Sequence, residues 1–273
     1  MIESVNVKTL FKGLFFSLLF LLVFFCISYF DNRTTIIFCD VGQGDGAYIR
    51  IKNRFDVVID AGPDRKILNC LGKYMPFYDR IIEFAFISHD QKDHFAGLIY
   101  LNERYTIKTV FVSPLQSNNE TYLKLEENLK NKKVEIKTTS SGMIIKILGD
   151  FLKFYSPKNP CIARDNNDCS QIFTFVENNI AVLFTGDASP KVLGSLLKET
   201  IRSITILKVP HHGSKNGLTE SFLRLVNPRV AVISVGKKNA YGHPHKEILD
   251  MLQSHKVKIR RTDLNGDIIF RLK

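Results

Sequence analysis

The segment Phe84-Ala-Phe-Ile-Ser-His89-Asp-Gln-Lys-Asp-His94 places two imidazoles and two carboxylates directly after an apolar run. The run 81–87 is typical of a buried strand, and residues 95–101 indicate the opening of a helix. Histidine and carboxylate are ligands of zinc, manganese and iron, and a loop at a strand end can direct several of them at one ion. The segment therefore predicts a metal site on a strand–loop–helix unit.

Six of the seven histidines fall in three pairs, and each pair follows an apolar, strand-like run. His211-His212 follows residues 204–210, and His243-Pro-His245 follows residues 230–235 after a short loop. A lone histidine is usually a structural residue, but histidines scattered through a core would not cluster at strand ends. We therefore interpret the pairs as parts of one site and place the remaining His255 on the surface.

Aspartates also follow apolar runs. Asp187 ends the run Val-Leu-Phe-Thr-Gly-Asp, where it is well placed to bridge metal ions; the alternative is an N-cap for a helix over 190–198. The stretches Asp40-Val-Gly-Gln-Gly-Asp45 and Asp60-Ala-Gly follow two earlier runs, and their glycines permit tight turns with positive φ. Taken alone, these two stretches predict only turns.

Strand and helix patterns divide the chain after residue 31 into two halves, each a sheet with helices on its outer face. A doubly wound sheet would lack the hairpins predicted in mid-chain. We expect one domain over 32–273. The strands are predicted over 35–39, 47–51, 56–59, 82–87, 109–112, 144–148, 151–155, 172–176, 180–184, 206–209 and 230–235, and the helices over 65–74, 95–102, 120–129, 190–198, 218–225 and 246–254.

Residues 13–30 are uncharged and mostly apolar, which is just long enough for a helix to cross a bilayer. Lys8 and Lys12 precede the run, so residues 1–31 are predicted to form a cytoplasmic stub and a single transmembrane anchor, with the domain outside the cytoplasm. A cleaved signal peptide is the main alternative, and a buried core helix is another.

The net charge of +11 falls almost wholly on the domain, because residues 1–30 contribute only +1 and leave +10 for the rest. Such a surface suits a polyanionic substrate or an anionic surface, although many basic proteins bind nothing acidic. The charge alone does not decide between these readings.

The five cysteines show no CxxC spacing, so we expect no cysteine metal site. Cys26 lies in the apolar run, and Cys39 and Cys70 are expected to be buried. Cys161 and Cys169 flank one polar loop and could pair if that loop is extracytoplasmic; two free thiols are the alternative.

Together these motifs resemble the metallo-β-lactamase superfamily, and more narrowly the C-terminal domain of ComEC-type DNA-uptake proteins. The resemblance runs from about residue 35 to the end of the sequence. It implies an αββα sandwich with a metal site at one edge and metal-dependent hydrolysis, with nuclease action on DNA the usual proposal. The segments that carry it are Asp60-x-Gly, His89…Asp93-His94, Gly186-Asp187, Asp40–Asp45, Val209–Ser214, Tyr241–His245 and Arg261–Asp263.

Two departures from the superfamily's pattern concern the ligands. Gln91 stands where the loop usually has histidine, or aspartate in ComEC relatives, and Asn166–Ser170 occupies the region of the usual middle histidine. The resemblance therefore implies one metal position left with His89 and a second, stronger position, for zinc or manganese. The predicted ligands of the stronger position are Asp93, His94, Asp187 and a late histidine, with His243 preferred and His245 as the alternative; Gln91 and Asp60 are further candidates.

The remaining polar residues are assigned to catalysis and substrate binding. Asp93 binds metal or orients the attacking water. His211 or His212 is predicted to be the general acid, to bind a phosphate, or to replace the missing ligand. The predicted phosphate-binding residues are Lys92, Lys208, Ser214 and Lys215, with plain solvated lysines as the alternative. The competing functions are hydrolysis of another phosphoester, such as a cell-wall component, and a catalytically weak DNA-binding module. The sequence shows no protein partner.

Overall fold

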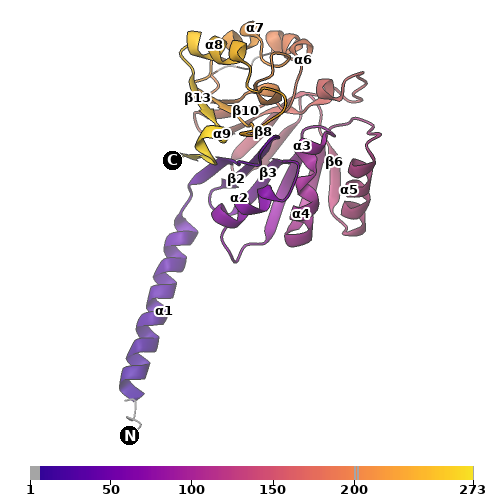
Figure 1. The fold of residues 1–273 in the computed structure, drawn as a ribbon. Coiled ribbons are helices and arrows are strands. Elements are labelled where there is room, and N and C mark those ends of the chain that lie inside the picture. Colours follow the sequence, from indigo (N-terminus) through magenta and orange to yellow (C-terminus); the bar gives the residue numbers. More distant parts are fainter. Residues whose placement is uncertain (1–6, 200, 202, 273) are drawn as a thin grey trace.

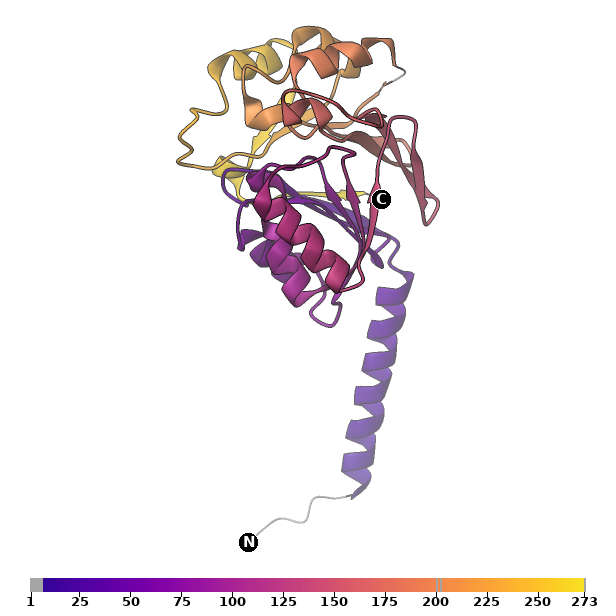
Figure 2. The same cartoon turned by 90° about the vertical axis from the view of Figure 1, so that its right-hand side faces the viewer.

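The computed structural model describes residues 7–199, 201 and 203–272, and it gives the backbone alone for residues 7 and 24–30. Two seven-stranded sheets lie face to face, and helices cover the outer face of each (Figures 1 and 2). This arrangement confirms the αββα sandwich predicted from the sequence.

The first sheet is antiparallel at one side and parallel at the other. Strands β14, β1, β2 and β3 alternate in direction, whereas β3 to β6 run parallel. Its order is β14 (Ile268–Leu272), β1 (Thr34–Phe38), β2 (Gly46–Ile51), β3 (Phe55–Ala61), β4 (Ile81–Ile87), β5 (Thr106–Val112) and β6 (Glu135–Thr138). The helices of this half are α2 (Lys66–Tyr74), α3 (Lys92–Phe95), α4 (Gly97–Arg104) and α5 (Glu120–Asn131).

The second sheet mirrors this design. Strands β7 to β10 form an antiparallel meander, and β10 to β13 run parallel. Its order is β13 (Lys258–Arg261), β12 (Val230–Ile233), β11 (Ile206–Lys208), β10 (Ile180–Phe184), β9 (Ile172–Glu177), β8 (Asp150–Ser156) and β7 (Ile144–Ile147). Its helical segments are η1 (Asn166–Cys169), α6 (Pro190–Ser195), η2 (Leu196–Lys198), η3 (Pro210–Gly213), α7 (Glu220–Val226), α8 (Lys246–Ser254) and α9 (Thr262–Asn265).

The eleven predicted strands and six predicted helices all have counterparts in the structure, with ends shifted by a few residues. Strands β6, β13 and β14 were not predicted. Strands β6 and β13 are short and rich in charged residues, so they lack an apolar run, and all three lie at sheet edges. An edge strand need not be apolar on both faces, so it can lack the continuous apolar run from which the other strands were predicted.

Aromatic side chains fill the space between the sheets. The rings of Phe154 and Phe173 from the second sheet lie 4.8 Å apart, and Phe173 is 5.4 Å from Phe86 of the first sheet. Phe38 and Phe184 stack across the same layer at 5.7 Å. Close packing of these rings fixes the two sheets against each other. The loops at one edge of both sheets are thereby held in a constant relation.

That edge collects the polar loops predicted from the sequence. Strands β3 and β4 run parallel, as do β10 and β11, so the loops at their carboxyl ends lie at the same edge. These loops begin after Ala61 and Ile87 in the first sheet and after Phe184 and Lys208 in the second, and the polar residues of interest lie within them or close to the strand ends. The fold therefore brings residues distant in sequence to one place.

Helix α1 (Val7–Phe30) extends away from the body of the molecule (Figures 1 and 2). Within the part of the chain that the structure describes, no helix has both the length and the apolarity needed to cross a bilayer. The side chain of Cys26, which the sequence analysis assigned to the apolar run, is outside the part of the chain that the structure describes. The division of the chain near residue 31 stays a prediction.

Two disulfides join cysteines in the domain. Cys161 pairs with Cys169, which agrees with one of the two predicted alternatives. Cys39 and Cys70 are buried as expected, but they are also bonded to each other. The sequence could not show this second bond, because it depends on α2 packing against the end of β1. Each bond limits the freedom of the unfolded chain and so stabilises the fold.

A buried ion pair stabilises the edge of the first sheet that lies opposite the polar loops. Arg50 pairs with the buried carboxylate of Asp56 and, at 3.0 Å, with Asp79, while the Tyr48 hydroxyl also donates to Asp56. We expect Arg50→Met to lower the free energy of unfolding by about 3–5 kcal/mol, because Asp56 would keep a buried, uncompensated charge.

Denaturant unfolding followed by circular dichroism measures this effect. The matched control is Arg224→Met, because Arg224 makes an exposed pair with Glu220 in α7 and should change stability by about 0.5 kcal/mol or less. Equal stabilities of the two variants would contradict the assignment of a structural role to the buried pair.

Candidate metal centre

His94 lies at the centre of the polar edge. It is fully buried at the start of the helical segment after β4, and its two ring nitrogens face different carboxylates. Its Nδ1 is 2.9 Å from Asp60 Oδ2, and its Nε2 is 3.3 Å from Asp187 Oδ1. The other oxygen of Asp60 accepts a hydrogen bond from the backbone N–H of Ser88. Asp60 therefore fixes the His94 ring and leaves Nε2 directed at Asp187.

His212 reaches the same place from the second sheet. Both His211 and His212 adopt left-handed backbone angles, with φ of 51° and 53°, and this turn directs the His212 ring inward. Its Nδ1 is 3.1 Å from Asp45 Oδ1, and its Nε2 lies 3.3 Å from Asp93 Oδ2 and 3.4 Å from Asp187 Oδ2. The same Nδ1 lies 3.0 Å from the Ser234 carbonyl, so this carbonyl and Asp45 together stand behind His212 as Asp60 stands behind His94.

His89 completes the cluster. Its ring is buried with its centroid 4.2 Å from that of His94, and its Nδ1 lies 3.0 Å from the Ser88 hydroxyl. Nitrogen and oxygen atoms of His89, His94 and Asp187 lie within 4.8 Å of one another, as do those of Asp93, His94 and His212. Either set provides three ligands of the kinds that divalent transition metals use.

Four buried atoms of these two sets have no hydrogen-bond partner among the described residues: Nε2 of His89, His94 and His212, and Oδ1 of Asp187; Oδ1 of the neighbouring Asp45 is a fifth. Buried polar atoms are rarely left without a partner. All four belong to the sets just described, so a divalent ion held by either set would supply the missing partner for the atoms of that set. The donor set therefore fits a metal such as zinc or manganese.

The charges of the cluster also favour a cation. Burial by itself lowers the pKa of His94 and His212, but the neighbouring carboxylates raise the pKa of His94 well above its usual value and that of His212 to about 9, with Asp187 the strongest contributor to both. Burial raises the pKa of Asp93, but His212 and His94 hold it at about 2. Positive charge beside the buried carboxylates therefore stabilises them, and either protons on the histidines or a bound metal ion can supply that charge.

The two departures from the superfamily pattern meet in the structure. The Gln91 amide donates to Asn167 Oδ1 at 2.8 Å, so the residue that replaces the loop's usual ligand bonds to the segment that replaces the middle histidine. Asn166 donates to Asp90 at 2.7 Å. These two hydrogen bonds place η1 against the metal loop.

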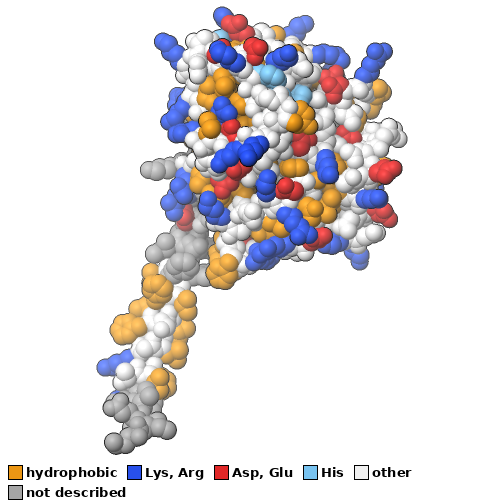
Figure 3. Space-filling view, in the orientation of Figure 1, with side chains coloured by type: hydrophobic (Ala, Val, Ile, Leu, Met, Phe, Trp, Pro, Cys, Tyr) orange, Lys and Arg blue, Asp and Glu red, His pale blue; other side chains and the backbone are white. Residues whose placement is uncertain are grey.

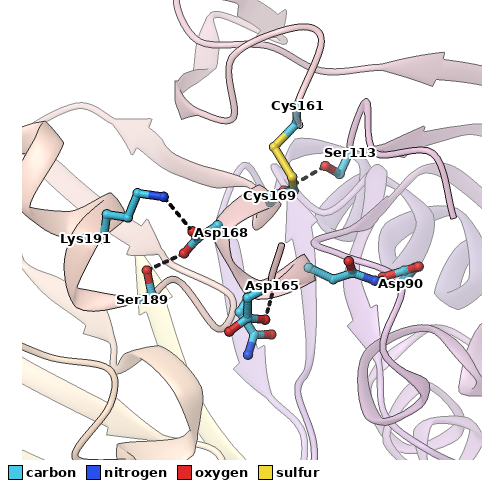
Figure 4. Close-up of a disulfide and its surroundings, with 10 residues drawn as sticks. Asp90, Ser113, Cys161, Asp165, Asp168, Cys169, Ser189 and Lys191 are labelled. Carbon is cyan, nitrogen blue, oxygen red and sulfur yellow. Dashed lines mark hydrogen bonds and ion pairs between the residues drawn. A yellow bond between two sulfur atoms is a disulfide. The ribbon is translucent and has the colours of Figure 1, made fainter. Parts of the chain in front are cut away.

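The Cys161–Cys169 disulfide lies at the end of η1 (Figure 4). The Ser113 hydroxyl donates to the Cys169 carbonyl at 2.7 Å, and Asp168 pairs with Ser189 and with Lys191 at 3.1 Å. Contacts on three sides thus hold η1 in position. Ser189 also caps α6, so Asp187 is not the N-cap considered from the sequence.

The other predicted histidines form a rim beside the cluster. His211 is partly exposed, with Nε2 3.8 Å from Asp187 Oδ2. The ring of His243 lies 5.9 Å from His211 and 6.3 Å from His212, and His245 accepts a hydrogen bond from the Lys215 backbone. Burial and the neighbouring histidines lower the pKa of His243 to about 4. Among the described residues, none of the three rim histidines belongs to a close ligand set. The ligand role of His243 stays a prediction.

The predicted phosphate-binding residues fall into two groups. Lys92 and Lys215 are exposed beside the cluster, and Ser214 is buried beneath it. Lys208 is buried and pairs with Asp45, so it cannot steer a phosphate, contrary to the prediction. Lys208 is buried because it lies within strand β11 and not on a loop.

Asp45 is the site residue that the sequence analysis missed, because its motif indicated only a turn. That turn is tight: a side chain at Gly44, which has φ of 140°, would lie 2.2 Å from the Asp93 carbonyl. The backbone N–H of Asp45 donates to the same carbonyl at 3.1 Å. The glycine thus allows the Asp45 loop to pack on the metal loop, and the close Gly-Asp spacing was the available signal.

Asp60 and Asp45 lie behind His94 and His212, and a substitution of Asp60 tests whether such a carboxylate supports metal binding. We expect Asp60→Asn to weaken metal affinity by about 10–100-fold. The neutral amide oxygen of asparagine accepts the His94 N–H more weakly than the charged carboxylate does, so it orients the ring less well. Competition with a chromophoric chelator measures the affinity. The control is Asp64→Asn, since Asp64 has a half-exposed side chain on the loop that follows β3. Unchanged affinity in Asp60→Asn would show that Asp60 does not orient a ligand.

No protein-family profile matches the chain. Curated relatives do match it. "ComE operon protein 3" of Bacillus subtilis is 28% identical over 96% of this chain and 36% of the relative. "Recombination protein 2" of Haemophilus influenzae is 28% identical over 84% of this chain and 28% of the relative. The chain spans about a third of the length of these proteins.

Solved structures share the fold. The metallo-β-lactamase fold protein YhfI of Bacillus subtilis superposes with a TM-score of 0.59, at 9% identity over 88% of this chain and all of that one. The Zn²⁺-bound PqqB of Methylobacterium extorquens gives 0.53, at 9% identity over 88% of this chain and all of that one. The chain is a metallo-β-lactamase-fold protein similar to ComEC-type competence proteins.

Proposed function

We propose that the chain is a metal-dependent phosphodiesterase that cleaves DNA. The observation that carries the proposal is the convergence of four unpartnered buried ligand atoms at the edge between the sheets. The similarity to proteins named for competence and recombination supports DNA as the substrate, and the basic surface visible in Figure 3 suits a polyanion.

His94, Asp187 and His212 would hold the metal, with His89 and Asp93 as the further ligands of the two close sets. A bound divalent ion at such a site lowers the pKa of water and polarises a phosphoryl oxygen. The Gln91–Asn167 hydrogen bond occupies the place of two further ligands, so the proposal includes one strong metal position per chain and a second that is weak.

The chain's own residues supply proton transfer and substrate positioning. Asp93 is the most exposed carboxylate of the cluster, with about 30% of its side chain accessible, so it can orient the attacking water. His211 is exposed beside Asp187 and can donate the proton of Nε2 to the leaving oxygen. The exposed Lys92 and Lys215 lie on either side and bind the phosphate.

The proposal also places the protein at a membrane. The uncharged, apolar residues 13–30 support a single anchor, and Lys8 and Lys12 before them support an inside N-terminus. This orientation leaves the metal centre outside the cytoplasm, where the two disulfides would be stable.

The test uses the purified full chain in detergent. Metal content is measured by mass spectrometry, and cleavage is measured on single- and double-stranded DNA, RNA and bis-p-nitrophenyl phosphate, with and without a chelator. We expect about one metal per chain and chelator-sensitive DNA cleavage. Cleavage of the small ester but not of DNA would indicate another phosphoester substrate. Salt-sensitive DNA binding without metal or cleavage would overturn the proposal in favour of a binding module.

A further inference from the structure

The loop between α2 and β4 exposes two adjacent aromatic side chains. Phe77 is 84% exposed and Tyr78 is 62% exposed, with ring centroids 5.5 Å apart, and Ile81 beside them is also exposed. A single exposed apolar residue needs no explanation, but neighbouring exposed aromatic rings mark a contact site. Neither ring belongs to the core or to the metal centre.

This loop lies at the edge of the first sheet opposite the metal centre. It leads into the amino end of β4, whereas the metal loop follows the carboxyl end of the same strand. Helix α1 also leads to this opposite edge. Thr34, the first residue of β1, accepts a hydrogen bond from the backbone N–H of Lys52 in the β2–β3 turn, which lies there. Figures 1 and 2 both show the α2–β4 loop on the side from which α1 projects.

Basic and apolar side chains accompany the aromatic pair at this edge. Exposed Arg80 and Arg104 flank the loop, and Leu148 of the β7–β8 turn, 47% exposed, lies beside Lys52. Figure 3 shows basic and hydrophobic side chains together at the lower end of the body.

The acidic groups here are mostly paired. Asp31 bonds Arg33 and Asp79 bonds Arg50, while Glu103 is exposed. The edge thus combines cations with aromatic rings, which is the composition of protein surfaces that sit in the headgroup region of a bilayer.

We propose that this edge rests on an anionic membrane surface, with Phe77 and Tyr78 inserted among the headgroups. The inference rests on the proposed anchor, because α1 would bring the edge to the bilayer. Tyr78 combines an apolar ring with a hydroxyl and so prefers the membrane interface, Phe77 adds an apolar ring that can insert, and the flanking arginines are attracted by anionic lipid. The metal centre, at the far edge of the same sheet, would then face away from the membrane.

The absence of tryptophan from the sequence makes the test direct. Phe77→Trp introduces a single tryptophan, which can be excited selectively over the nine tyrosines, into the full chain. The variant is reconstituted in vesicles of phosphatidylcholine and phosphatidylglycerol with or without brominated acyl chains. We expect brominated lipid to reduce the emission of this variant by about half. Replacing phosphatidylglycerol by phosphatidylcholine should weaken the quenching.

Two further variants separate the outcomes. Phe20→Trp lies in α1 and reports the anchor, and Ile162→Trp, at a position 92% exposed on the loop before η1, reports the metal-centre side. Quenching of F20W alone would overturn the membrane contact while the anchor stands. No quenching of F20W would overturn the anchor itself. Equal quenching of F77W and I162W would overturn the proposed orientation, and a concentration-dependent shift of F77W emission without lipid would identify a second copy as the occupant instead.

Discussion

We expect Asp187→Asn to release the proposed metal and to lower the proposed phosphodiester hydrolysis by about three orders of magnitude or more. Asp187 is buried, with one oxygen 3.3 Å from His94 Nε2 and the other 3.4 Å from His212 Nε2. Asparagine keeps the shape of the side chain but removes its charge and replaces one acceptor by a donor. A donor directed at a metal opposes binding, so the loss should far exceed that of a residue behind the ligands.

The experiment measures metal content after gel filtration and the hydrolysis of bis-p-nitrophenyl phosphate. Asp168→Asn is the control, because Asp168 pairs with Ser189 and Lys191 outside the ligand sets. That control should retain its metal. Thermal unfolding of both variants confirms that they are folded. A stoichiometric metal content in Asp187→Asn would contradict the proposed centre.

His212→Gln weakens metal binding by about 100-fold or more, whereas His243→Gln leaves it within a few-fold of the parent. The reason is geometric. The Nε2 of His212 lies within 3.4 Å of both Asp93 and Asp187, but the His243 ring is 6.3 Å from the His212 ring and outside the close sets. Removing His212 also leaves Asp45 without one of its three cationic partners, which are Lys208, His212 and, at 3.8 Å, His94.

Chelator competition on the two variants, made side by side, decides between the histidines. The opposite result, with metal lost only in His243→Gln, would make His243 the late ligand preferred from the sequence. That outcome would require the 236–245 loop to move inward when metal binds. His211→Gln provides a third comparison: it should keep the metal but lose activity, because His211 is proposed to act on the leaving group.

The sequence predicted the sandwich and the location of the centre because both follow from local patterns. Apolar runs give the strands, and polar residues just after parallel strands meet at one sheet edge, which is how His89, His94 and Asp187 were found. Asp45 was missed because its partners, His212 and Lys208, lie far along the chain. The Cys39–Cys70 bond was missed for the same reason.

The choice among the late histidines shows a different limit. His211 and His212 both take left-handed backbone angles, and this conformation alone turns the His212 ring into the cluster and His211 toward solvent. Side chains with a Cβ rarely adopt it, so no propensity predicts it. The surrounding structure imposes the turn, since the Gly213 carbonyl and the His211 N–H are both bonded to other loops of the edge.

The pairing of β14 with β1 has a consequence for how the protein is made. Thr34 lies opposite Leu272, so the first strand of the domain and the last are neighbours although nearly the whole domain separates them in sequence. During synthesis and export, the outer side of β1 stays without its partner until residues 268–272 reach the compartment in which the domain folds. Such a long-range closure is a slow step. The nascent domain is therefore most exposed to wrong strand pairing just before it is finished, and a chaperone that shields β1 should raise the yield of folded protein.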